Sequence, residues 1–201
     1  MAITYPISAP AEVAQRAKFR TRVAAAVSES PFTFGQQVYV HAGQLLLVDV
    51  ELPPLIRADA EAVVGFLLAL NGHEGTFTMA PPGNASGVRG TWAGSPLVNG
   101  DHAAGVSSIV MDGFSAGATA KAGDWVGIGS YVHKVTRDAT ADGSGNLTLE
   151  IWPRLRAAVS NNAALDITAP EGLWRLATPE VEWDVEVAQI YGVRFTAMEA
   201  L

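Results

Sequence analysis

Residues 180–187 alternate strictly between acidic and apolar side chains, and this pattern constrains the fold more than any other feature of the sequence. The acidic positions are Glu180, Glu182, Asp184 and Glu186, and the apolar positions are Val181, Trp183, Val185 and Val187. Because successive side chains of a strand point to opposite faces, the alternation predicts a strand with one core face and one solvent face.

Turn-forming residues also favour a mainly β fold, since 20 glycines and 11 prolines among 201 residues indicate short strands joined by many turns. Near the N-terminus we expect strands at 19–27, 37–40 and 45–52, with turns at 28–31 and 41–43. In the last of these strands, Val48, Val50 and Leu52 share one face.

One long helix is expected at residues 57–71, after the strand-ending Pro53 and Pro54 and before the stop at Asn71 and Gly72. Its apolar stripe comprises Val63, Phe66, Leu67 and Leu70, and Val64 and Leu68 widen it. We therefore expect Leu67 to be buried against a sheet.

Composition shifts at Pro81 and Pro82, because residues 83–130 hold many glycines and few charges. Short strands are expected in this region, at 107–111, 125–128, 131–136 and 147–151. The predicted fold is a split β-sandwich domain with one packed helix, made by residues 1–82 and 174–201, plus an inserted small β-barrel-like module at 83–173.

Several classes of protein are excluded or disfavoured by the bulk properties. The chain has no cysteine, so disulfides and thiolate zinc sites are absent. A net charge of −7 disfavours a large nucleic-acid-binding surface. The N-terminus has no signal-peptide pattern, and the dense apolar run at 62–70 is too short to span a bilayer. We expect a soluble protein without membrane insertion.

Nothing in the sequence predicts a catalytic, metal or cofactor site. His41, His73, His102 and His133 are too scattered for a metal motif and are interpreted as surface or locally bonded imidazoles. Asp101 and His102 lack the Gly-x-Ser-x-Gly elbow of a hydrolase, although a dispersed triad stays open. The glycines at 123–129 lack the lysine of a phosphate loop.

The tryptophans and the acidic face each allow more than one interpretation. Trp183 alternates with valines and is expected in the core, whereas Trp92 lies in a glycine-rich loop and is the candidate exposed aromatic for a sugar or a partner. The acidic face is either a solvated edge or the wall of an aqueous channel. Calcium binding is a further option, but a regular strand does not make its carboxylates converge.

Five segments resemble, in their order, the minor tail proteins of long-tailed bacteriophages. They are Leu-Pro-Pro-Leu at 52–55 with the following helix, Gly-His-Glu-Gly-Thr-Phe at 72–77, Ala-Gly-Asp at 122–124, His-Lys-Val at 133–135, and Ile-Trp-Pro-Arg-Leu-Arg at 151–156. The resemblance covers about residues 45–176.

This resemblance implies a structural virion protein, assembled in the bacterial cytoplasm, and no enzyme. The implied role is a distal tail protein whose copies form a six-fold ring between the tail tube and the tail tip or baseplate hub. Its partners would be further copies of itself, the tail tube protein, the hub proteins and the tape measure protein, with DNA only as passing cargo. Alternatives are a carbohydrate-binding accessory module for host adsorption, and a neck or tail completion protein.

Overall fold

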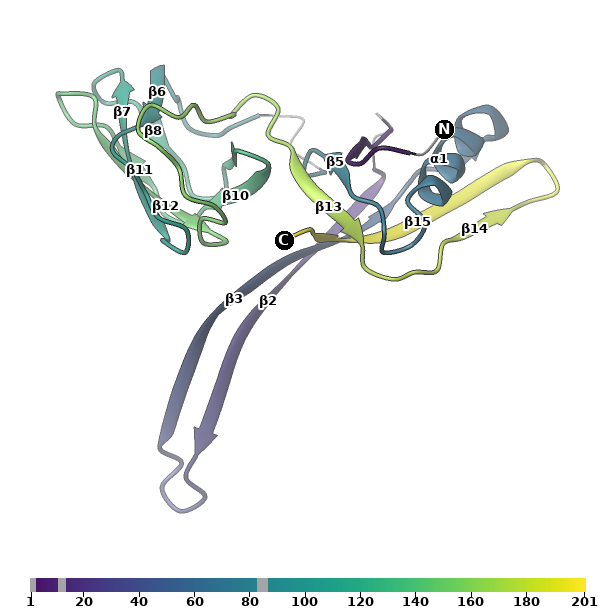
Figure 1. Cartoon of the computed structure of the whole chain (residues 1–201), viewed down its shortest axis with the longest axis horizontal. Coiled ribbons are helices and arrows are strands. Elements are labelled where there is room, and N and C mark those ends of the chain that lie inside the picture. The colour runs from purple at the N-terminus through teal and green to yellow at the C-terminus, as the bar shows by residue number, and fades with distance from the viewer. Residues whose placement is uncertain (1–2, 11–13, 83–86) are drawn as a thin grey trace.

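The computed structural model describes residues 3–10, 14–82 and 87–201. Figure 1 shows two β regions side by side and a long hairpin that projects away from both of them. Strands make up 47% of the structure and helix 7%, so the prediction of a mainly β fold is confirmed.

The first region is an eight-stranded sheet. Its strands are β1 (Ile7–Ser8), β2 (Arg16–Glu29), β3 (Gln36–Glu51), β4 (Leu55–Ile56), β5 (Phe77–Met79), β13 (Gly172–Leu176), β14 (Glu182–Val185) and β15 (Ile190–Glu199). The main order is β1-β5-β13-β15-β3-β2, and β14 and β4 each pair with β15. The central strand β15 is therefore at the C-terminal end of the chain.

The second region holds a five-stranded sheet and a two-stranded sheet. The larger has the order β6 (Gly94–Val98), β7 (Ser108–Phe114), β12 (Leu147–Trp152), β10 (Tyr131–Val135) and β9 (Trp125–Ile128). The smaller pairs β8 (Thr119–Ala120) with β11 (Ala139–Thr140). The four strands predicted in this region are all present, with small differences at their ends.

Strand pairing connects the segments on both sides of the second region. β13 pairs with β5 and β15, and β15 pairs with β3, so the C-terminal segment joins the N-terminal sheet. The division into an outer domain and an inserted module at 83–173 stays a prediction. Part of its first boundary, at Gly83, lies outside the described residues.

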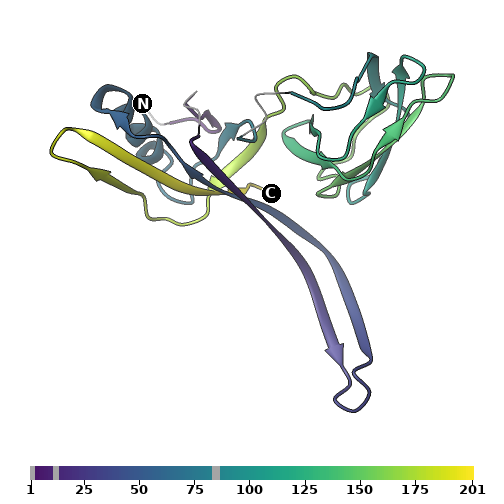
Figure 2. The same ribbon diagram turned by 180° about the vertical axis from the view of Figure 1, so that it is seen from behind.

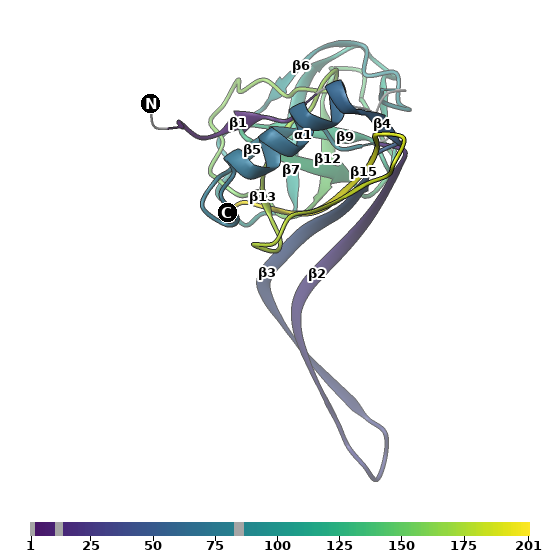
Figure 3. The same ribbon diagram turned by 90° about the vertical axis from the view of Figure 1, so that its right-hand side faces the viewer.

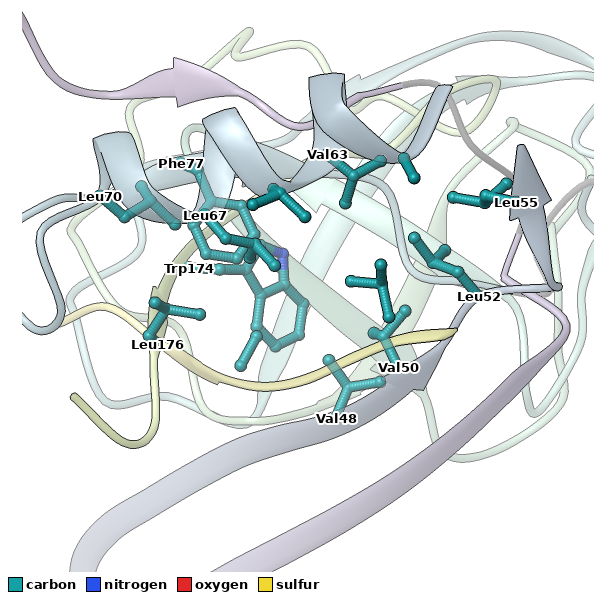
Figure 4. Packing of buried hydrophobic residues seen from close by; sticks show 14 of the residues in the cluster. Val48, Val50, Leu52, Leu55, Val63, Leu67, Leu70, Phe77, Trp174 and Leu176 are labelled. Atoms are coloured by element: carbon teal, nitrogen blue, oxygen red, sulfur yellow. The ribbon is translucent and has the colours of Figure 1, made fainter. Parts of the chain in front are cut away.

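The helix α1 (Arg57–Ala69) covers one face of the first sheet (Figures 3 and 4). Val63, Leu67 and Leu70 are buried, as the apolar stripe predicts, and Phe66 is partly buried. Leu68 does not widen the stripe, because its side chain is 56% exposed on the outer side of the helix. The helix packs over buried residues of β3 and β13, including Val48, Val50 and Trp174 (Figure 4).

β2 and β3 form one long hairpin, so the turn expected at residues 41–43 is wrong. β3 continues through this segment, and the pairing with β2 shifts there, between the pairs Val23–Gln44 and Ala25–Val40. The extra residues are absorbed as a β-bulge instead of reversing the chain. The chain reverses after Ser30, where Phe34 has a φ of 54° and donates its backbone N–H to the Ser30 carbonyl.

Candidate assembly surface

The predicted exposed aromatic Trp92 is buried, which corrects the sequence interpretation. Its side chain is only 4% exposed, and its indole N–H donates to Asp124 Oδ2 at 2.8 Å. Asp124 also accepts from the backbone N–H groups of Arg89, Gly90 and Lys121. Burial would raise the pKa of Asp124, but these donors outweigh burial and hold the pKa below its usual value. The loop is thus folded onto one carboxylate, and Trp92 presents no platform for a sugar.

His102, His133 and Asp101 are within hydrogen-bonding distance of backbone groups. His102 Nε2 accepts the backbone N–H of Val110, and Asp101 accepts that of Asn161. His133 is fully buried, with Nδ1 at 2.8 Å from the carbonyl of Pro153. Burial lowers the pKa of His133 to about 4. Within the described residues, no group of three or more His, Asp or Glu side chains could hold a metal ion.

The predicted acidic strand is shorter and more exposed than expected. All four acidic side chains are exposed, but the strand β14 covers only Glu182–Val185. The assignment of Trp183, Val185 and Val187 to the core is wrong, since they are 39%, 54% and 104% exposed. Among the described residues β14 pairs only with β15, and none of these three side chains belongs to the core cluster under α1. Val181 alone packs partly against the core.

A polar face lies on the side of the first sheet opposite α1. Alternation puts Val48 and Val50 on the buried face of β3, so Asp49 and Glu51 lie on the other one. Asp49 Oδ1 accepts hydrogen bonds from Thr196 Oγ1 at 2.8 Å and from Arg20 at 2.5 Å. Burial would raise the pKa of Asp49, but these donors outweigh burial and lower the pKa.

An open groove lies on this polar face, and side chains of both charges line it. Its charged residues are Arg16, Lys18, Asp49, Glu51, Glu180, Glu182 and Arg194. The basic residues of β2 were missed by the sequence reasoning. The sequence does contain a pattern that predicts them on one strand face, because basic residues occupy every second position, at Arg16, Lys18, Arg20 and Arg22.

The second unexpected surface is the outer part of the hairpin, residues 23–43, which we call the arm. Figure 2 shows the arm projecting from the body. Residues 20–29 and 31–43 are all exposed. The exposed large apolar side chains of the arm are Val23, Val27, Phe32, Phe34, Val38, Tyr39 and Val40. Val27 lies opposite Val38 and Ala25 opposite Val40, so one arm face carries a continuous apolar patch.

No protein-family model matches this chain, and no curated protein matches it. Among the described residues, no helix is both long and apolar enough to cross a membrane.

Proposed function

We propose that this chain is a structural protein of a phage tail, a distal tail protein whose copies form a ring between the tail tube and the tail tip or baseplate hub. The resemblance of residues 45–176 to minor tail proteins motivates the proposal. The observation that carries it is the arm, because it exposes more apolar surface than a monomeric protein has reason to keep.

The exposure of the arm favours an assembly role over a catalytic one. Phe32 and Phe34 at the tip are 92% and 74% exposed. An exposed two-stranded ribbon with apolar side chains is an aggregation hazard unless another surface covers it. In a ring, neighbouring subunits or the adjoining tail proteins cover the arm, and the side chains gain the free energy of burial there.

The finer architecture belongs to the same proposal. Residues 1–82 and 174–201 form the split β-sandwich domain of the ring, and residues 83–173 form the inserted β-barrel-like module. The pairing of β13 with β5 and of β15 with β3 supports the split. The exposed Glu180, Glu182, Asp184 and Glu186 face the lumen through which DNA passes.

A reconstruction of the phage particle tests the proposal. We expect a closed ring of this chain, six-fold by the resemblance, with Phe32 and Phe34 buried against neighbouring subunits. A tail with a single copy of the chain, or with arms exposed to solvent, would overturn the proposal. Carboxylates of β14 on the outer rim would overturn only the lumen assignment.

A matched pair of variants provides a second test. Phe32→Ser with Phe34→Ser should leave folding unchanged but prevent incorporation into tails, because only the assembled state covers these rings. Val110→Ser is the control, since Val110 is also exposed, at 38%, but lies on β7 in the second region. Normal incorporation of the arm variant would contradict the assembly role of the arm.

A further inference from the structure

Two strands of the first sheet carry opposite charges on the same face. Along β2 the polar face carries Arg16, Lys18, Arg20 and Arg22, at every second residue. Along β14 the same face carries Glu182 and Asp184. Glu180, just before the strand, lines the groove on this face, and Glu186 continues the alternation where the chain turns back to β15. Each set has four charges at every second residue, so the two sets are equal in length and opposite in sign.

Both strands are edges of the sheet. β14 pairs with β15 on one side only, and β2 pairs with β3 on one side only, within the described part of the chain. Each therefore has one row of backbone N–H and C=O groups free to pair with another strand. Because they lie on opposite sides of β15 and β3, they cannot pair with each other in one molecule.

Charges alternate along the row that connects these two edges. Glu182 lies opposite Arg194, Arg194 opposite Glu51, and Glu51 opposite Arg16, across β14, β15, β3 and β2. Opposite charges on directly opposed positions of neighbouring strands stabilise a sheet, whereas like charges destabilise it. The row begins with an acid at one edge and ends with a base at the other. A second copy placed beside β2 would continue the alternation.

We propose that β14 of one copy pairs with β2 of the next copy, so that the sheets join into one continuous sheet around a ring. This inference rests on the proposed ring and adds which surfaces form it. The pairs β14–β15, β15–β3 and β3–β2 are all antiparallel, so the neighbour's β14 would also run antiparallel to β2. The interface is heterologous, as a closed ring requires.

One register matches all four basic residues with acidic ones. It sets Arg22 opposite Glu180, Arg20 opposite Glu182, Lys18 opposite Asp184 and Arg16 opposite Glu186 of the neighbour. Relative to the row within one copy, where Glu182 aligns with Arg16, this register is displaced along the strands. Closing a sheet into a barrel needs such a stagger. On the other face the same register covers the half-exposed Trp183 with the neighbour's Phe19.

Cross-linking tests the edges directly, because the chain has no cysteine. Lys18→Cys with Asp184→Cys in one chain, treated with a short thiol cross-linker at rising protein concentration, should give a ladder of oligomers. Either cysteine alone should give no product, and a mixture of the two single variants should give dimers only. Products from a single variant would indicate a symmetric interface, and absence of the ladder up to the solubility limit would overturn the proposal.

Charge reversal provides the second arm of the test. Lys18, Arg22, Glu180 and Asp184 make no ion pair among the described residues. Lys18 lies directly opposite Asp49, however, so urea unfolding of the Lys18→Glu variant is measured first to show that the sheet stays folded. Lys18→Glu with Arg22→Glu should weaken self-association at least about tenfold, as should Glu180→Lys with Asp184→Lys. Mixing the two variants should restore association, because each reversed edge then meets a complementary one. Unchanged association of either variant, or no restoration on mixing, would overturn the edge pairing.

The outcomes separate this inference from the proposed function. A ring in the particle whose subunits touch through other surfaces would remove the edge pairing and leave the tail role standing. A ladder of cross-linked oligomers in solution, without any ring in the particle, would overturn the tail role and leave the edge pairing standing.

Discussion

The base and the arm of the β2–β3 hairpin are built from the same two strands, yet one is buried and the other is exposed. In the base, Leu46, Val48 and Val50 are 2%, 0% and 4% exposed. In the arm, Val38 and Val40 are 55% and 64% exposed. The side chains are of the same kind, so the difference comes from what covers them.

The base is covered because β15 pairs with it and α1 packs over its apolar face. The arm extends beyond both elements (Figure 1). An alternating pattern therefore predicts which side chains share a face, but not whether the same chain covers that face. The same holds for Trp183 on β14. Its alternation with valines predicts a buried side chain, but the side chain is exposed.

The largest effect is expected where the base meets the second region. Arg156 donates from Nε to Glu199 Oε1 at 2.8 Å and from Nη2 to the Gln44 carbonyl at 2.8 Å. The side chains of Arg156 and Glu199 are only 10% and 3% exposed. Arg156→Met should lower the free energy of unfolding by about 3–5 kcal/mol, because it leaves a buried carboxylate unpaired. Denaturant titration measures the loss.

Two further variants sharpen this prediction. Adding Glu199→Leu to Arg156→Met should recover most of the loss, since the buried charge is then gone. Arg194→Met breaks an ion pair whose side chains are 71% and 73% exposed, so it should cost less than about 1 kcal/mol. Equal losses for the two arginines would mean that Arg156 is not buried in solution.

The next effect concerns the helix that covers the base. Leu67 is fully buried, so Leu67→Ala should cost about 2–5 kcal/mol through lost burial and the cavity that remains. Leu68→Ala is the neighbouring control and should change stability little, because Leu68 is 56% exposed. If thermal or urea unfolding shows a loss below about 0.5 kcal/mol for Leu67→Ala, the helix does not pack as described.

Acid should destabilise the protein through His133 in the second region. Burial, together with the nearby charge of Arg156, lowers its native pKa to about 4, compared with 6.5 for an unperturbed imidazole. The unfolded chain therefore takes up the proton first as pH falls. The stabilising contribution is complete above pH 6.5 and is lost between pH 6.5 and 4. The loss amounts to about 3 kcal/mol.

Urea titrations at several pH values measure this loss. His133→Gln is the comparison, because carboxylates that titrate in the same range affect both proteins and cancel in the difference. The variant should have the shallower dependence on pH between 6.5 and 4. Parallel curves would contradict the assignment of a neutral, buried His133.

Local sequence pattern predicts burial where neighbouring residues decide it and fails where distant residues decide it. The period of the helix identified Val63, Leu67 and Leu70 as buried, because a helix face is decided by residues a turn apart. The burial of Trp92 was missed because it depends on Asp124, 32 positions away in the sequence. The length of β3 was missed for a similar reason. The strand continues through residues 41–43 because it pairs with β2, whereas Gly43 on its own favours a turn.

The candidate interface was half predictable. The acidic residues were found because they alternate with apolar ones, but the basic residues Arg16, Lys18, Arg20 and Arg22 alternate equally well. What the sequence lacks is the sheet order, which puts the two sets at opposite edges. Complementarity between edges is a property of the topology, and it becomes visible only when the strands have been placed.

The smallest effect on stability, and the sharpest contrast between base and arm, is expected from one substitution made in both places. Val→Thr keeps the β-branched shape and adds a hydroxyl group. Val48→Thr buries that hydroxyl in the core and should cost about 1–3 kcal/mol. Val40→Thr should stay within about 0.5 kcal/mol in the isolated chain, since the side chain is 64% exposed. In an assembled ring the two sites should become alike, because the neighbour covers the arm and the added hydroxyl becomes costly there as well.

A combined Val27→Thr, Val38→Thr and Val40→Thr variant should therefore unfold like the unmodified chain in urea but incorporate poorly into tails. If the isolated variant is destabilised as much as Val48→Thr, the arm is covered by its own chain, and the contrast between base and arm disappears.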